Sequence, residues 1–352
     1  MDVSIDRPRL MKLLERLLTA HAPPGAEGEV DAIVMEEVRA LAASVWQDAA
    51  ESIVVHFRGR GDGAPVAVTA HKDEISLMVR RVQDDGRLRV RPLGGLHAWA
   101  VGEGPVDVLT EGEPVTGILS VGSKHVSNES PAGPLKSGKG VEWEKFWIET
   151  KRTAAELRDL GVHRGSKAVL ARSRKPPVFI GDFICGYNLD CRAGLAVLIE
   201  AARQLAETPP PNDVYLIASS EEEIGAQGAA FSIGQLPAQT AVALDIAPVA
   251  EEYQIRNCGK PVLLWGDATG VYHERTLRHM EALATRMGFE TQPAVVTSYG
   301  SDASIAKRTG SAGRSACIAY PGENTHGYEI CSMEGIVNSA RLLMAYLRNP
   351  LE

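Results

Sequence analysis

The stretch VAVTAHKD at residues 66–73 joins a short apolar run, typical of a buried strand, directly to three ionisable side chains. Two later stretches repeat this arrangement, VYLIASSEEE at residues 214–223 and AVALD at residues 241–245. In open α/β sheets, ligands bind beyond the carboxyl ends of parallel strands. Three strand ends that carry histidine and carboxylate side chains therefore predict an α/β fold with one shared site.

Length and composition set the class of protein. The chain has 352 residues, 44% of them hydrophobic and 23% charged, which predicts a globular protein of two domains. The net charge of -8 and the lack of a basic stripe argue against a nucleic-acid partner. No run approaches the ~20 apolar residues of a membrane span, so we expect no membrane partner. The five cysteines are scattered and odd in number, which favours a reducing compartment, and we predict a cytoplasmic protein.

The two end portions of the chain have the patterns of helices and strands that are typical of an α/β domain. Leucines at residues 10, 13, 14, 17 and 18 form the apolar stripe of an amphipathic helix. We expect further helices at residues 27–42, 192–205, 274–287 and 333–347. We expect strands at residues 52–57, 65–70, 213–218 and 240–244.

The middle of the chain has the pattern of short antiparallel strands. Residues 87–91, RLRVR, alternate apolar and polar side chains as a half-buried antiparallel strand does, and glycine turns recur at short spacing. A Ser/Gly/Pro-rich stretch at residues 127–140 is predicted to be an exposed loop. We therefore predict a mixed-sheet α/β catalytic domain at residues 1–74 plus 177–352, interrupted by a smaller β-rich domain at residues 75–176.

Five side chains suit a pair of divalent metal ions. His71 and His326 can each supply an imidazole nitrogen, and Asp190, Glu223 and Asp245 can supply carboxylates. Two ions ~3.5–4 Å apart clamp the attacking and leaving oxygens of a hydrolysis reaction. Asp190, which opens a helix in the stretch NLDCRAG at residues 188–194, is our candidate for the bridging ligand.

Two further acids have predicted catalytic roles. Asp73 follows His71 by two residues, so its carboxylate can accept the other ring N–H of a ligating histidine. Glu222 and Glu223 are adjacent at a strand end and point in different directions. Glu223 can then bind metal while Glu222 faces the attacking water as the general base.

Each motif alone also has an ordinary structural interpretation. A His-x-Asp pair often arises by chance, three consecutive glutamates are usually a solvated acidic face, and Asp190 alone is a good helix N-cap. His326 alone is a satisfied core or surface histidine. The order of these motifs and their position at strand ends favour the metal site.

The motifs together resemble the M42 family of metallo-aminopeptidases, which includes glutamyl and tetrahedral (TET) aminopeptidases. The resemblance runs over nearly the whole chain. It is carried by PGAE at residues 24–27, AHKDEISLMV at 70–79, LDCRAG at 189–194, EEIGAQGA at 222–229, GSDA at 300–303 and TH at 325–326.

The resemblance implies a dinuclear aminopeptidase. It implies that His71, Asp190 and Asp245 hold one ion, that Asp190, Glu223 and His326 hold the other, and that Glu222 is the base. The expected cofactors are two divalent ions per subunit, zinc first, with cobalt or manganese as the other candidates. The expected partners are a peptide substrate and further copies of the chain, up to a dodecamer assembled through the inserted domain. In the wider class of dinuclear aminopeptidases the bond after the bridging aspartate is often cis, and we expect a cis bond between Asp190 and Cys191.

Three positions depart from the family pattern. Cys191 stands where the family has a second aspartate, Lys72 replaces a usual methionine and adds a positive charge near the site, and Glu323 stands where relatives carry arginine. The last change predicts that acidic N-terminal residues are poor substrates.

Three alternatives to the aminopeptidase stay open on sequence alone. They are a metal-dependent deacylase or specialised dipeptide hydrolase on the same scaffold, a glycoside hydrolase that uses the carboxylates, and a non-catalytic assembly subunit.

Overall fold

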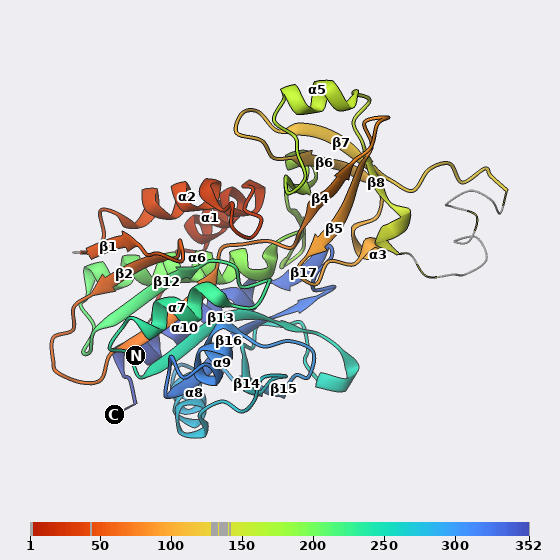
Figure 1. Cartoon of the computed structure of the whole chain (residues 1–352). Helices are drawn as coiled ribbons and strands as arrows, with labels where there is room; N and C mark the ends of the chain where they lie inside the picture. Colours follow the sequence, from red (N-terminus) through yellow and green to blue (C-terminus); the bar gives the residue numbers. More distant parts are fainter. Residues whose placement is uncertain (1–2, 43, 128–132, 134–139, 141, 352) are drawn as a thin grey trace. The chain divides into compact units, whose positions relative to one another are not determined.

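The computed structural model describes residues 3–42, 44–127, 133, 140 and 142–351, which fall into two units (Figure 1). The first unit comprises Met1–Glu74, Pro177–Thr325 and Glu329–Glu352, and the second comprises Ile75–Pro176 and His326–Tyr328. Most of the stretch at residues 127–140, which we expected to be a loop, lies outside the described residues.

The first unit is built on a mixed sheet with the strand order β1-β2-β12-β3-β13-β16-β17-β11-β10, to which β14 and β15 are added beside β16. The strands are β1 (Ser44–Gln47), β2 (Ile53–Phe57), β3 (Val66–His71), β10 (Val178–Ile180), β11 (Phe183–Gly186), β12 (Val214–Ser219), β13 (Thr240–Pro248), β14 (Val262–Gly266), β15 (Gln292–Val295), β16 (Arg314–Glu323) and β17 (Glu329–Ser332).

The centre of this sheet is parallel. β12, β3, β13 and β16 run in the same direction, and β3 and β12 are buried along their whole length. Parallel strands that are covered by helices on both faces have this continuous apolar character. The carboxyl ends of the central strands therefore meet at one edge of the sheet, as the sequence predicts.

Helices cover this sheet. They are α1 (Arg7–Thr19), α2 (Gly28–Val38), α6 (Leu189–Glu207), α7 (Gln227–Gly234), α8 (Glu274–Arg286), α9 (Asp302–Arg308) and α10 (Met333–Arg348). α6 packs against β3, β12 and β13, and α1, α2 and α10 pack against α6. α7 and α9 pack against each other and against the central strands. The predicted leucine stripe of α1 is buried in the core of this unit.

The second unit is a closed barrel with the strand order β4-β5-β8-β7-β6-β9. Its strands are β4 (Ser76–Val82), β5 (Leu88–Leu93), β6 (Gly104–Val108), β7 (Val115–Ser120), β8 (Trp147–Glu149) and β9 (Lys167–Leu170), and its helices include α3 (Ala98–Val101) and α5 (Ala154–Asp159). The barrel has a hydrophobic core of its own, which includes Leu77, Leu88 and Leu119. An α/β unit with a mixed sheet and a separate β-rich unit confirm the predicted fold class.

Two expectations about single elements are wrong. The strand expected to end at Leu244 continues to Pro248, because β16 pairs with it residue by residue up to Gly322. Asp245 thus lies within a strand rather than after one. The helix expected to begin at Arg192 begins at Leu189, although the backbone of Asp190 and Cys191 is not helical.

Candidate metal centre

Three neighbouring strands bring the predicted side chains to one edge of the sheet. Ser219 of β12 is aligned with His71 of β3. On the other side of β3, Ala243 of β13 is aligned with Thr69, which places Asp245 level with His71. The acidic stretch that follows Ser219 therefore begins beside His71.

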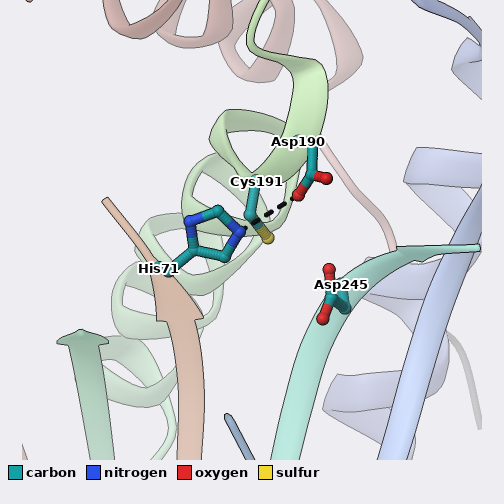
Figure 2. A group of neighbouring side chains, drawn as sticks. All are labelled: His71, Asp190, Cys191 and Asp245. Atoms are coloured by element: carbon teal, nitrogen blue, oxygen red, sulfur yellow. Dashed lines mark hydrogen bonds and ion pairs between the residues drawn. The ribbon is translucent and has the colours of Figure 1, made fainter. Parts of the chain in front are cut away.

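Four side chains of the first unit form a compact donor set (Figure 2). His71, Asp190, Cys191 and Asp245 are buried, and each offers one ligand atom within 4.8 Å of the others. His71 Nε2 lies 3.0 Å from Asp190 Oδ1. Two ligands of one zinc ion lie at most about twice a bond of ~2.0–2.3 Å apart, so this spacing fits a single ion after a small adjustment.

Asp190 is held by backbone geometry and by one acid that the sequence did not single out. Asn188, two residues before Asp190, has a left-handed backbone with φ 66°, and the Asp190–Cys191 peptide bond is cis, as we expected. The backbone N–H of Asp190 donates to Glu329 Oε2 at 3.0 Å. Glu329 is buried, and it fixes the start of α6 where the predicted bridging ligand lies.

Cys191 belongs to the donor set, although we had not placed it among the ligands. Its thiol donates to the Leu244 carbonyl oxygen at 3.1 Å, and the Tyr320 hydroxyl lies 3.7 Å from Sγ. A Cβ atom at Gly194 would lie 2.5 Å from the sulfur, so only glycine leaves room for this packing. Cys191 replaces the aspartate that is usual in the family, and its surroundings fit a neutral thiol in size and hydrogen bonding.

The acidic stretch after β12 contributes the next two predicted residues. One ligand atom of Glu223 lies within 4.8 Å of one of Asp190. Glu222 Oε2 lies 4.0 Å from His71 Nε2. The two glutamates therefore lie beside the donor set, Glu222 next to His71 and Glu223 next to Asp190.

Asp73 connects this stretch to β3. Its Oδ1 accepts the backbone N–H of Glu222 and its Oδ2 accepts that of Glu223, each at 3.0 Å. Asp73 Oδ1 lies 3.4 Å from His71 Nδ1, and the backbone oxygen of Asp73 lies 3.2 Å from the same nitrogen. Asp73 is therefore a positioning residue for the acidic stretch as well as a neighbour of the histidine ring.

The electrostatics of this region favour positive charge. Burial raises the pKa of the Glu222 carboxyl and that of Asp245 well above their ordinary values, and neighbouring carboxylates act in the same direction. Burial also raises the pKa of Asp302 to about 6. Burial lowers the pKa of His71, but the hydrogen bonds to Asp190 and Asp73 and the charge of Glu222 outweigh it, and the net shift is upward. Clustered buried carboxylates repel one another, so a divalent cation stabilises them.

Asp302 is a second acid whose place the sequence did not reveal. It lies in the first turn of α9, and its Oδ2 accepts the Ser219 hydroxyl at 2.5 Å. Ser219 is the last residue of β12, so this bond ties α9 to the strand that leads into the acidic stretch. The GSDA pattern at residues 300–303 was the available signal, but the pattern alone gave no role.

His326 lies in the short segment His326–Tyr328, which belongs to the second unit. Its backbone is left-handed, with φ 62°, and its Nδ1 lies 3.1 Å from the Gly95 carbonyl oxygen. The carbonyl oxygen accepts a hydrogen bond from the Nδ1–H, and this tautomer has its free lone pair on Nε2. This tautomer suits a ligand, and the ligand role of His326 stays a prediction.

Lys72 does not add an uncompensated charge beside the donor set. It is fully buried, and its Nζ lies 3.1 Å from Glu27 Oε2 and also pairs with Asp31. Both acids come from the start of α2, and they neutralise the charge that we expected near the site.

Comparisons with known proteins identify the family. A family model described as M42 glutamyl aminopeptidase matches residues 51–342. The lysyl aminopeptidase of Pyrococcus furiosus is 28% identical over 223 residues, which are 61% of this chain and 59% of that protein.

Solved structures share the fold. A TET aminopeptidase from a marine sediment archaeon of the Thaumarchaeota superposes with a TM-score of 0.89 at 24% identity, covering 97% of both chains. The TET1 peptidase of Pyrococcus horikoshii superposes with a TM-score of 0.84 at 24% identity, covering 97% of this chain and 99% of that one. The family match confirms the resemblance seen in the sequence.

Proposed function

This chain belongs to the M42 glutamyl aminopeptidase family and is a peptide hydrolase, and from this premise we propose that it removes N-terminal residues from peptides with the help of two divalent metal ions. The observation that carries the proposal is the donor set of His71, Asp190 and Asp245, whose ligand atoms lie within 4.8 Å of one another. Family membership leaves the glycoside hydrolase without support.

We assign the ligands as the family resemblance implies. His71, Asp190 and Asp245 would hold one ion, and Asp190, Glu223 and His326 would hold the other, with Asp190 common to both sets. The nitrogen and oxygen donors suit zinc, with cobalt and manganese as alternatives. Bound ions would supply Lewis-acid polarisation of the scissile carbonyl and would lower the pKa of water in the site.

Glu222 is the proposed general base. Its carboxylate accepts a proton from the attacking water and returns that proton to the nitrogen of the leaving amine. The position of Oε2, 4.0 Å from His71 Nε2, supports this role because the carboxylate then faces the donor set without belonging to its inner ligands. Asp73 fixes the backbone of Glu222 by accepting its N–H. Its carboxylate also lies beside His71 Nδ1, which favours the ring orientation that a metal ligand needs.

We also propose that the chain forms a homo-oligomer through the barrel unit. The TET1 peptidase of Pyrococcus horikoshii is described as assembling into a tetrahedron or a large octahedral shell. The barrel unit of this chain exposes the apolar side chains of Trp99, Ile118 and Leu160, which supports a contact there.

The compartment is part of the proposal. None of the helices among the described residues has the length and apolar character needed to cross a membrane. All five cysteines are free, and a reducing compartment such as the cytoplasm suits free thiols.

A panel of aminoacyl chromogenic amides tests the function. The protein is assayed as prepared, after chelation, and after the return of zinc, cobalt or manganese singly. We expect hydrolysis that is lost on chelation and restored by a divalent ion. Activity on N-acyl substrates or on dipeptides alone would favour the deacylase or the specialised dipeptide hydrolase instead.

A further inference from the structure

Lys72 is a fully buried cation that three oxygen atoms surround. Its Nζ lies 3.1 Å from Glu27 Oε2, pairs with Asp31, and donates to the Glu51 carbonyl oxygen at 2.6 Å. The exposed fraction of Lys72 is 0%, whereas Asp31 keeps part of its side chain in contact with solvent. Glu27 is therefore the buried acid that depends most on this cation.

The second carboxylate oxygen of Glu27 points toward the acidic stretch. Glu27 Oε1 accepts the backbone N–H of Glu221 at 3.1 Å and that of Gly25 at 3.2 Å. Glu221 has a left-handed backbone, with φ 53°, a conformation that costs energy for a residue with a side chain. A hydrogen bond from a buried carboxylate offsets that cost and holds the turn in place.

Two buried carboxylates thus hold three consecutive backbone amides. Glu27 accepts the N–H of Glu221, and Asp73 accepts those of Glu222 and Glu223. Glu27 comes from the start of α2, and Asp73 lies two residues after β3. The stretch that carries the proposed base and a proposed metal ligand is therefore fixed by its backbone.

We propose that Lys72 and Glu27 form a positioning pair that holds residues Glu221–Glu223 in the geometry needed for catalysis. The inference rests on the proposed function for its catalytic consequence. Lys72 acts through Glu27, because its ammonium group lies 3.1 Å from Glu27 Oε2 while Oε1 accepts the N–H of Glu221. Without the cation, Glu27 either takes up a proton or is an uncompensated buried charge, and in both cases the carboxylate loses the contact that holds it in place. Lys72, which departs from the family pattern, is therefore a positioning residue for the active site.

Four variants of the full chain test the pair. Glu27→Ala removes the acceptor, whereas Glu27→Gln keeps an oxygen acceptor and removes the charge. Lys72→Met removes the cation and leaves Glu27 without its counter-charge, and the double variant Lys72→Met/Glu27→Gln keeps the acceptor without an ionisable group in its place. Glu200→Gln is the matched control, since Glu200 is a buried acid that pairs with Arg9 away from the acidic stretch.

The first measurement is amide hydrogen exchange of a peptide covering residues 219–226. We expect faster exchange in Glu27→Ala and in Lys72→Met, and exchange close to wild type in the double variant. The control should leave this peptide unchanged. Unaltered exchange in Lys72→Met, or a double variant as fast as Lys72→Met, would overturn the pairing, even if the protein hydrolyses no peptide.

The second measurement is steady-state kinetics of the metal-loaded variants. In metal-loaded enzyme, a displacement of the base lowers kcat with KM unchanged, by about 10- to 100-fold for a shift of roughly 1 Å. We expect this loss in Glu27→Ala and Lys72→Met, and recovery in the double variant. A lower melting temperature with wild-type kcat would assign the pair a purely structural role and overturn the proposal. An inactive wild-type protein would instead refute the proposed function and leave the exchange result to decide the pairing.

Discussion

Asp73 Oδ1 accepts the backbone N–H of Glu222 at 3.0 Å, which couples the proposed base to the strand that carries His71. The other oxygen of the same carboxylate accepts the N–H of Glu223. A single buried acid therefore sets the positions of one proposed metal ligand, the proposed base and the histidine ring beside it. Displacement of this carboxylate would disturb all three at once.

We predict that Asp73→Asn lowers activity by about 10- to 100-fold, the usual cost when a residue that orients a metal ligand is changed. The asparagine amide group would place N–H donors against a backbone N–H that now has an acceptor. Asp213→Asn is the matched control, because Asp213 also accepts a backbone N–H, from Gly59, and pairs with a histidine at the other end of β12. Metal content and kcat/KM are measured for both variants, and equal losses would refute a specific role for Asp73.

We predict that Glu222→Gln binds metal as the wild type does but loses turnover by ~10²–10⁴-fold, the contribution of a well-placed general base. The reason is that glutamine keeps the shape of the side chain and cannot accept a proton. Metal content by elemental analysis and kcat at saturating substrate separate the two effects. A metal-loaded Gln variant with near-normal turnover would transfer the role to another residue.

Much of the site follows from local sequence. His71 and the acidic stretch come directly after apolar runs, so their meeting at one edge of the sheet needs only the rule for parallel strands. Asp245 also belongs to such a run, although the true length of its strand depends on the pairing with β16. That pairing joins residues about 75 positions apart, which short-range periodicity does not register.

The supporting acids did not follow from local sequence. Glu27, Asp302 and Glu329 occur singly, and in a sequence an isolated acid has the character of a surface residue. Each is buried here because a donor from a distant segment meets it: the N–H of Glu221, the hydroxyl of Ser219 and the N–H of Asp190, respectively. The neutralisation of Lys72 was missed for the same reason, since its acidic partners lie more than forty residues earlier.

The metal-free protein should be less stable at pH 7 than at pH 5. Burial raises the pKa of Asp302 to about 6 and that of Glu27 to about 7, and it raises those of Glu222 and Asp245 well above their ordinary values. A raised acid pKa means that the folded state binds more protons than the unfolded state between the two pKa values. The free energy of unfolding therefore falls as the pH rises through this window.

Metal should reverse this trend, because the ion replaces the protons and its affinity rises with pH. Thermal melts of chelated and zinc-loaded protein at pH 5, 6 and 7 measure it. We expect the shift in melting temperature on metal binding to grow from pH 5 to pH 7. A shift that is constant or shrinks would contradict the electrostatic account of the site.

Acidic N-terminal residues should be poor substrates. Glu323 ends β16 and its Oε1 accepts the side-chain N–H of Asn257 at 3.2 Å, so its negative charge has a fixed position three residues before His326. The charge disfavours a second carboxylate and favours neutral or basic side chains. Initial rates on Glu-, Leu- and Lys-amides test this order, and Glu323→Arg should improve the Glu-amide relative to the Lys-amide. Faster hydrolysis of the Glu-amide by the wild type would refute it.

The barrel unit should carry the contacts between subunits. Trp99 is 70% exposed, and Ile118 and Leu160 are also exposed. A contact with another subunit would remove these apolar side chains from water. We expect light scattering at micromolar concentration to give a mass well above that of one chain, and Trp99→Asp together with Ile118→Asp to reduce it. Val271→Asp is the control, because Val271 is 72% exposed on the first unit and should leave the mass unchanged. A monomeric wild type, or an assembly that only Val271→Asp dissolves, would exclude the barrel unit as the main interface.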